Sequence, residues 1–253
     1  MLRKIFIVYT LFIIFTPIAS ASGSNENVSS ASISKANENL HAVILQPNGL
    51  PYEEPAVLTE GYVSNLYKEL NLSEKVSYNI FKRAFYGYHK TAEKKVGILT
   101  IIDYTKPSNV PRFFVLNFIE KKIQYETYVS HGKNSGLLIP VIFSNNRNSF
   151  QTSLGFYKTM DTYNGDFGYS LRLIGLENGF NSNALERKIV IHGADYVDQS
   201  FIASHGFLGR TNGCPALPYS ISAEIINYLK NGSVIYIIGN DNKYEQRSKY
   251  VTF

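Results

Sequence analysis

The sequence predicts a mostly β protein: a sheet sandwich with one or two packed helices, preceded by a short α-helical lead-in. The chain has 19 Tyr, 16 Phe and no Trp, and aromatic side chains favour strands. From Val96 onward the apolar pattern changes from a helical period to short β-branched runs separated by turn residues. We therefore expect a helical lead-in over residues 59–92 and a sheet-rich domain over 93–253.

The N-terminus has the pattern of a secretory signal peptide, residues 1–21. Arg3 and Lys4 precede an apolar run over 5–18, and Ala19-Ser20-Ala21 is an A-x-A cleavage site. The apolar run is shorter than the roughly 20 residues that a transmembrane helix needs. We expect an exported protein, periplasmic or secreted to the cell envelope, with no stable membrane insertion after cleavage. An uncleaved membrane anchor is the alternative.

Residues 22–58 are predicted to form a flexible or extended tether. The first part is rich in Ser and Asn and has few large apolar side chains, so it cannot bury enough surface to fold. Two helices should follow within 59–92, the second with Ser73 as its N-cap. The first helix is indicated by apolar residues spaced i, i+3, i+4, i+7, namely Val63, Leu66, Tyr67 and Leu70.

The remaining elements are expected from runs of β-branched and aromatic residues. A helix with Ser220 or Ser222 as N-cap should precede the last strand, and 195–209 should be a loop. The expected strands are 97–104, the hairpin of 113–118 and 123–129, 141–143, 154–157, 169–173, 189–191 and 234–238.

Cys214 is the only cysteine in the chain. Exported proteins usually pair their cysteines, so a single one is either a buried small hydrophobe or a working thiol. Cys214 follows Asn212-Gly213, a polar turn, which favours a functional thiol. The strand at 189–191 ends on His192-Gly193, so an imidazole and a thiol lie at the two ends of the segment between His192 and Cys214. These are the parts of a Cys/His nucleophilic site.

Other site types fit this pattern less well. Papain-like proteases place Cys before His, and caspases place His about 50 residues before Cys. A metal site from His192, His205 and Cys214, with Asp195 nearby, lacks the spacing of known metal motifs. We therefore predict no metal and no cofactor.

The net charge indicates no nucleic-acid partner. It is +5 for the whole chain and falls to +3 without Arg3 and Lys4, from 23 basic and 20 acidic residues. No stripe of clustered Lys and Arg accompanies this weak charge, so the sequence does not predict nucleic-acid binding.

Around His192 and Cys214 the sequence resembles the murein L,D-transpeptidase catalytic domain family, in particular the branch with Gly-Cys-Pro-Ala at its active-site cysteine. That family carries a strand ending in His-Gly and then [Ser/Thr]-x-Gly-Cys, matched here by His192-Gly193 and by Thr211 to Cys214. The resemblance covers roughly 96–240. Many members have His where this chain has Asn212, and Arg or Asn where it has Ala216. Further similar stretches are 103–108, 130–136, 153–159, 168–173 and 175–176.

The resemblance implies Cys214 as nucleophile and His192 as general base, with a backbone carbonyl rather than Asp195 orienting the imidazole. Gly193 and Gly213 would shape the site. The N–H groups of Gly213 and Cys214 would face a developing oxyanion. The candidate substrate-binding residues are Arg210, Asn212, His131, Tyr157, Arg172 and His205, the last also a reserve base.

The reaction implied is acyl transfer between peptidoglycan stem peptides through a Cys214 thioester, and a carbapenem is expected to form an adduct at the same thiol. Two alternatives remain open at this stage. The same residues would serve an L,D-carboxypeptidase or endopeptidase on peptidoglycan. A non-catalytic cell-wall-binding protein would instead show a buried, unreactive Cys214.

Overall fold

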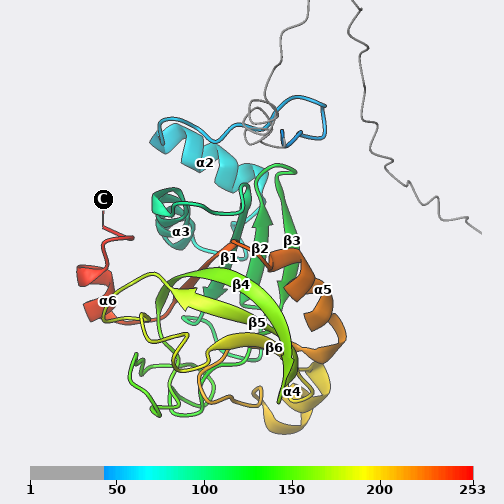
Figure 1. Cartoon of the computed structure of the whole chain (residues 1–253), viewed down its shortest axis with the longest axis vertical. Helices are drawn as coiled ribbons and strands as arrows, with labels where there is room; N and C mark the ends of the chain where they lie inside the picture. Colours follow the sequence, from blue (N-terminus) through cyan, green and yellow to red (C-terminus); the bar gives the residue numbers. More distant parts are fainter. Residues whose placement is uncertain (1–42, 253) are drawn as a thin grey trace, which may run out of the picture. The chain divides into compact units, whose positions relative to one another are not determined.

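The computed structural model describes residues 43–252. The predicted signal peptide and the predicted tether up to residue 42 lie outside the described residues. One sheet of eight strands organises the described chain, in the order β3-β2-β1-β8-β4-β5-β6-β7 (Figure 1). The strands are β1 (Ile98–Asp103), β2 (Phe113–Asn117), β3 (Lys122–Thr127), β4 (Gly155–Gly165), β5 (Gly168–Gly175), β6 (Val190–Ala194), β7 (Ala216–Pro218) and β8 (Val234–Ile238).

The mostly β class is confirmed, and the layers predicted as a sandwich are parts of this single mixed sheet. β1 pairs with β8 in parallel and so joins the β1–β3 meander to the strands that carry the candidate site. β1, β2 and β8 are buried along their whole length. Their largely apolar sequences, interrupted by Thr100 in β1, are the pattern of strands covered on both faces.

The helices of the described chain are α2 (Glu60–Glu69), α3 (Tyr78–Lys90), α4 (Gln199–His205), α5 (Tyr219–Leu229) and α6 (Asn242–Arg247). Of these, α2, α3 and α5 fall where the sequence predicts helices, whereas α4 and α6 were not predicted. α3 packs against β1 and β8, whereas α5 packs against β5, β6 and β7. α2 buries Val63 and Leu66, the face that the periodicity predicts. Within residues 43–252 every helix is too short or too polar to cross a membrane.

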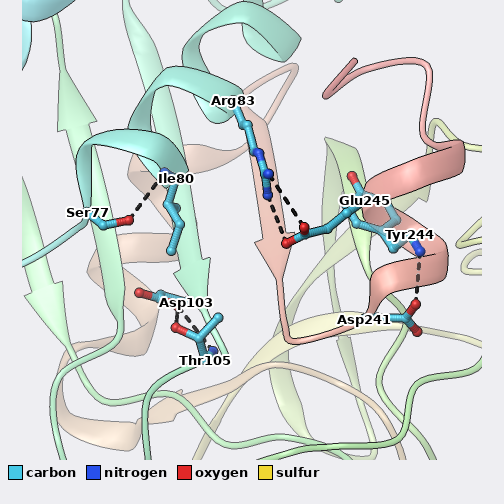
Figure 2. A network of polar contacts seen from close by, with 8 residues as sticks. All are labelled: Ser77, Ile80, Arg83, Asp103, Thr105, Asp241, Tyr244 and Glu245. Carbon is cyan, nitrogen blue, oxygen red and sulfur yellow. Dashed lines mark hydrogen bonds and ion pairs between the residues drawn. The ribbon is translucent and has the colours of Figure 1, made fainter. Parts of the chain in front are cut away.

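The helix ends differ from the predicted caps. Ser77 rather than Ser73 is the N-cap of α3, because residues 73–76 form a turn before the helix. The Ser77 hydroxyl accepts the N–H of Ile80 at 3.4 Å (Figure 2). For α5 neither predicted serine is the cap: the N-cap is Pro218, which makes no side-chain capping bond.

α6 is tied to the rest of the fold at its first turn and along its side. Asp241 caps it by accepting the N–H of Tyr244 at 2.9 Å. Arg83 of α3 donates to Glu245 of α6 at 2.9 Å, as Figure 2 shows. This ion pair joins two helices through residues that are 162 positions apart along the chain.

Two local predictions were wrong. Residues 141–143 form no strand: Val141 and Ile142 are 63% and 54% exposed, and both backbone N–H groups bond to the carbonyl of Ser135. The Val141 and Ile142 side chains face solvent and, of the three, only Phe143 packs against the core, so composition alone misassigned the segment. The predicted loop 195–209 contains α4, which is capped by Asp198 accepting the N–H of Phe201 at 2.6 Å.

Candidate active site

His192 and Cys214 lie near the β6–β7 edge of the sheet and line one cleft. His192 is in the middle of β6, and Cys214 comes two residues before Ala216, the residue that pairs with His192 in the parallel β6–β7 ladder. The cleft has a volume of about 320 Å³. It is lined by Phe167, Arg187, Lys188, His192, Tyr196, Arg210, Thr211, Asn212 and Cys214.

The turn that presents Cys214 is closed by Thr211. Its hydroxyl donates to the Cys214 carbonyl at 2.7 Å and accepts the N–H of Gly213 at 3.0 Å. Gly213 has a φ of +124°, and a Cβ there would lie 2.9 Å from the carbonyl oxygen of Gln151, so only glycine fits. The Gly213 N–H is engaged inside the turn, so of the two N–H groups expected to face an oxyanion only that of Cys214 stays a candidate.

Cys214 is buried, with 7% of its surface exposed, and belongs to the main hydrophobic core. Its Sγ lies 3.6 Å from the Lys188 carbonyl oxygen, to which the thiol donates. Burial raises the pKa of the thiol to about 11, and the backbone N–H of Val190 and the charge of Arg187 offset this only in part. The resting cysteine is therefore a protonated thiol at neutral pH.

His192 is held as a neutral ring. Its Nδ1–H donates to the carbonyl of Gly193 at 3.0 Å, which leaves Nε2 without a proton and able to accept one. Phe167 stacks on the ring with 4.6 Å between centroids. Burial lowers the pKa of His192 below its ordinary value of 6.5, while the bond to Gly193 opposes this. The orienting group is thus a carbonyl, and Asp195 is an exposed residue beyond the strand.

Gly193 allows this strand to approach α5. A Cβ at Gly193 would lie 2.4 Å from the hydroxyl of Ser222 and 3.0 Å from the Tyr219 ring. The helix therefore packs directly on the backbone beside His192 and fixes the strand that carries it.

Proton transfer from Cys214 to His192 is uphill in the resting cleft. The pKa of the thiol is about 11 and that of the imidazole is below 6.5. Each pKa unit between donor and acceptor costs about 1.4 kcal/mol. Groups that stabilise the thiolate in the cleft therefore have a direct effect on how reactive Cys214 is.

Two of the predicted substrate-binding residues line the cleft. Asn212 is exposed at its rim, and Arg210 donates to the carbonyls of Lys133 and Gly136 at 3.1 and 3.3 Å. Arg172 lies outside it, in a neighbouring groove of about 330 Å³ that shares Phe167 and Lys188 with the cleft.

The other three predicted residues do not reach the cleft. His131 is fully buried: its Nδ1 accepts from Arg112 at 2.7 Å and its Nε2–H donates to the Gly136 carbonyl at 3.2 Å. Burial and the Arg112 charge lower its pKa to about 3. Tyr157 is a core residue that donates to the Ser153 carbonyl at 3.0 Å. His205 is exposed at the end of α4, where its ring stacks on Phe201.

The structure adds cleft residues that the sequence did not indicate. Arg187 stands between Glu186 and Lys188, and such a run of charges reads as a solvated surface. Phe167 sits at the β4–β5 turn, and its ring covers His192. Its only sequence signal was an aromatic residue in a hairpin turn.

The described residues offer no metal site to compete with this pair. Within 43–252 no three His, Cys, Asp or Glu side chains are grouped so that they could hold a metal ion. His205, a member of the alternative ligand set, does not line the cleft that holds His192 and Cys214.

Comparison with known proteins gives a family match over most of the described chain. The model of the L,D-transpeptidase catalytic domain matches residues 72–238, and so it includes α3 as well as every strand. A search of curated proteins found no match.

Solved structures with partial similarity include three bacterial proteins. An L,D-transpeptidase from Mycobacterium smegmatis is 15% identical with a TM-score of 0.35, over 56% of this chain and 59% of that one. An L,D-transpeptidase from Stackebrandtia nassauensis is 15% identical with a TM-score of 0.36, over 71% and 77%. A helical cell shape determining protein from Campylobacter jejuni is 11% identical with a TM-score of 0.38, over 63% and 56%. The chain thus spans less than two thirds of the mycobacterial protein.

Proposed function

The chain belongs to the L,D-transpeptidase catalytic domain family, and we propose that it is an exported cysteine acyltransferase that cross-links peptidoglycan stem peptides. The observation that carries the proposal is the shared cleft of Cys214 and a neutral, carbonyl-oriented His192. A thiol with an unprotonated imidazole nitrogen in the same cleft is the minimal apparatus for acyl transfer.

The proposed reaction has two halves. In the first, His192 Nε2 takes the Cys214 proton while the sulfur attacks the carbonyl of the third residue of a tetrapeptide stem. The C–N bond to the terminal D-Ala breaks, D-Ala leaves with the proton from His192, and a thioester remains. In the second, the amine of another stem attacks the thioester, forms the new amide and returns a proton through His192 to the sulfur.

The charge of the cleft supports an anionic peptide substrate. Its lining residues include Arg187, Lys188 and Arg210 and no Asp or Glu. The terminal D-Ala of a stem peptide carries a carboxylate, which is attracted to such a lining. Asn212 at the rim adds an uncharged hydrogen-bonding group.

The proposal includes the location and organisation of the chain. A signal peptide over residues 1–21 would deliver the protein to the periplasm or cell envelope, where its substrate is. Residues 22–58 would tether the domain and 59–92 would lead into it. The family match begins at residue 72, within the proposed lead-in, so it includes α3 with the catalytic domain.

Intact-protein mass spectrometry with purified tetrapeptide muropeptides tests the function. We expect a Cys214 thioester adduct, release of D-Ala and a cross-linked dimer, with all three lost in Cys214→Ala. Cys214→Ser should leave little activity, because a serine alkoxide is much harder to form than a thiolate.

Three other results would change the assignment. Free tripeptide without dimer at high acceptor concentration would make the enzyme an L,D-carboxypeptidase. If neither a muropeptide nor a carbapenem forms an adduct, the non-catalytic wall-binding protein is the assignment left. That alternative requires a Cys214 that is both buried and unreactive, and the structure shows the burial. Unfolding of Cys214→Ala while wild type stays folded would assign the thiol a packing role, in keeping with its place in the core.

A further inference from the structure

Arg187 donates four hydrogen bonds to protein groups near Cys214, whereas a solvated surface arginine bonds mainly to water. It lies two residues after Leu185 and just before β6, it is half-buried, and its guanidinium lines the cleft. Nη1 donates to the Ser144 carbonyl at 2.7 Å and to the Ser153 hydroxyl at 2.6 Å. Nη2 donates to the Gln151 carbonyl at 2.6 Å and to the Ser149 hydroxyl at 3.3 Å.

These four bonds fix an irregular segment. Residues 144–153 have no helix or strand, and Asn148 and Phe150 adopt left-handed backbone angles. The guanidinium bonds both ends and the middle of the segment, which only a planar fork with several donors can do. Arg187 thereby sets the position of Gln151, whose carbonyl faces the cysteine turn.

The same guanidinium touches the turn that carries the nucleophile. A Cβ built on Gly213 would lie 3.1 Å from Arg187 Nη2 and 2.9 Å from the Gln151 carbonyl oxygen. Arg187, Gln151 and Gly213 therefore form one close contact immediately before Cys214. A displacement of Arg187 would move the wall against which this turn rests.

The positive charge of Arg187 is not neutralised by a carboxylate of the described chain. Its acceptors are carbonyl and hydroxyl oxygens, and the adjacent Glu186 pairs with Arg147 at 2.6 Å instead. A half-buried charge without a counter-ion stabilises a negative charge that forms near it. Within the cleft that charge forms on the Cys214 sulfur.

We propose that Arg187 is a positioning residue for Cys214, which holds the wall of the cysteine turn and supplies the charge that favours the thiolate. In the step it assists, the S–H bond breaks, the proton passes to His192 Nε2, and the electron pair stays on sulfur. The Coulombic effect of Arg187 on Cys214 acts in this direction, against the larger effect of burial. The inference deepens the proposed function, but it concerns the thiol itself and can be tested without peptidoglycan.

The test is the rate of Cys214 alkylation by iodoacetamide between pH 6 and 11 in the full mature chain, followed by intact mass. In Arg187→Gln we expect the rate at pH 8 to fall about tenfold and the thiol pKa to rise by about one unit. Arg187→Lys keeps the charge, so its rate should stay within about threefold of wild type. Arg147→Gln is the matched control: it removes one positive charge from the same segment at an exposed ion pair, and the rate should be unchanged.

Two results would overturn the proposal. One is an Arg187→Gln variant that is folded by circular dichroism and alkylates with the wild-type pH profile. The other is an Arg187→Lys variant as slow as Arg187→Gln, which would show that the charge has no part. If Arg187→Gln does not fold, the Lys variant still decides: its pH profile must match wild type, while its 144–153 segment must become more sensitive to limited proteolysis. Absence of muropeptide turnover with Arg187-dependent alkylation would instead count against the proposed function alone.

Discussion

His192 and His205 both belong to the region that carries the candidate site, yet the structure gives their rings different surroundings. His192 is 1% exposed, is fixed by the Gly193 carbonyl and is covered by Phe167. His205 is exposed at the end of α4 and does not line the cleft. A base must be held near the proton it accepts, and of these two rings only that of His192 lines the cleft that contains Cys214.

We predict that His192→Ala lowers the rate of carbapenem acylation of Cys214 by about 10²–10⁴-fold, the usual contribution of a general base. His205→Ala should change it less than twofold, and it serves as the matched control because it removes an imidazole from the same part of the chain. Acylation followed by intact mass makes the comparison. Loss of the acylation rate in His205→Ala with retention in His192→Ala would reassign the base.

The pH dependence of acylation follows from the environment of the same ring. His192 accepts a proton only when neutral, and burial lowers its pKa below 6.5, so the neutral form persists to a lower pH than usual. We expect the carbapenem acylation rate to rise with pH through a midpoint below 6.5 and to stay level from about pH 7 to 9. A midpoint above pH 7.5 would indicate that the base is not this buried imidazole.

At the scale of secondary structure, the contact of α3 with the sheet depends on one glycine. A Cβ at Gly87 would lie 2.0 Å from the Phe156 ring of β4. That ring cannot move aside, because it is stacked between Tyr236 at 4.4 Å and Tyr250 at 5.0 Å. The helix therefore lies on the sheet at a distance that only glycine permits.

We predict that Gly87→Ala lowers the free energy of unfolding by about 1–3 kcal/mol, the typical cost of overpacking. Gly61→Ala in α2 is the matched control, since nothing lies within 4 Å of its Cβ position. It should raise the free energy of unfolding by about 0.5–1 kcal/mol through helix propensity. Urea unfolding measures both, and equal effects of the two changes would mean that α3 does not pack as described.

The sequence could predict the elements in which apolar residues are buried in the folded chain. Residues 234–238 are continuously apolar and form β8, buried throughout; the hairpin 113–129 has its turn and both strands where predicted. Residues 141–143 are just as apolar, but the N–H groups of Val141 and Ile142 bond to the Ser135 carbonyl rather than to a neighbouring strand, and both side chains face solvent. Ser77 rather than the predicted Ser73 caps α3, because an extra turn lies between the two serines.

At the scale of the whole molecule, the sequence could predict which residue types react but not which other side chains line the cleft. Cys214 and His192 stand out by residue type and context. The sequence did not show that His131 and Tyr157 are buried in the folded chain, because burial depends on how distant segments pack. Arg187 reaches the cleft only because segments 34 to 43 residues away in sequence fold against it, so no local pattern identifies it.

Export is the remaining property on which the proposed function of the whole protein depends, because peptidoglycan lies outside the inner membrane. The apolar run over 5–18 is short for a membrane span, and Ala19-Ser20-Ala21 supplies small residues at the cleavage position. We predict that the full chain expressed in a bacterium is processed to begin at Ser22, as N-terminal sequencing and intact mass of the periplasmic fraction will show. Ala19→Asp should block processing, since a charged side chain does not fit the small-residue site, whereas Ala31→Asp should not. An unprocessed wild-type chain that stays with the membrane fraction would contradict cleavage and make residues 1–21 an anchor.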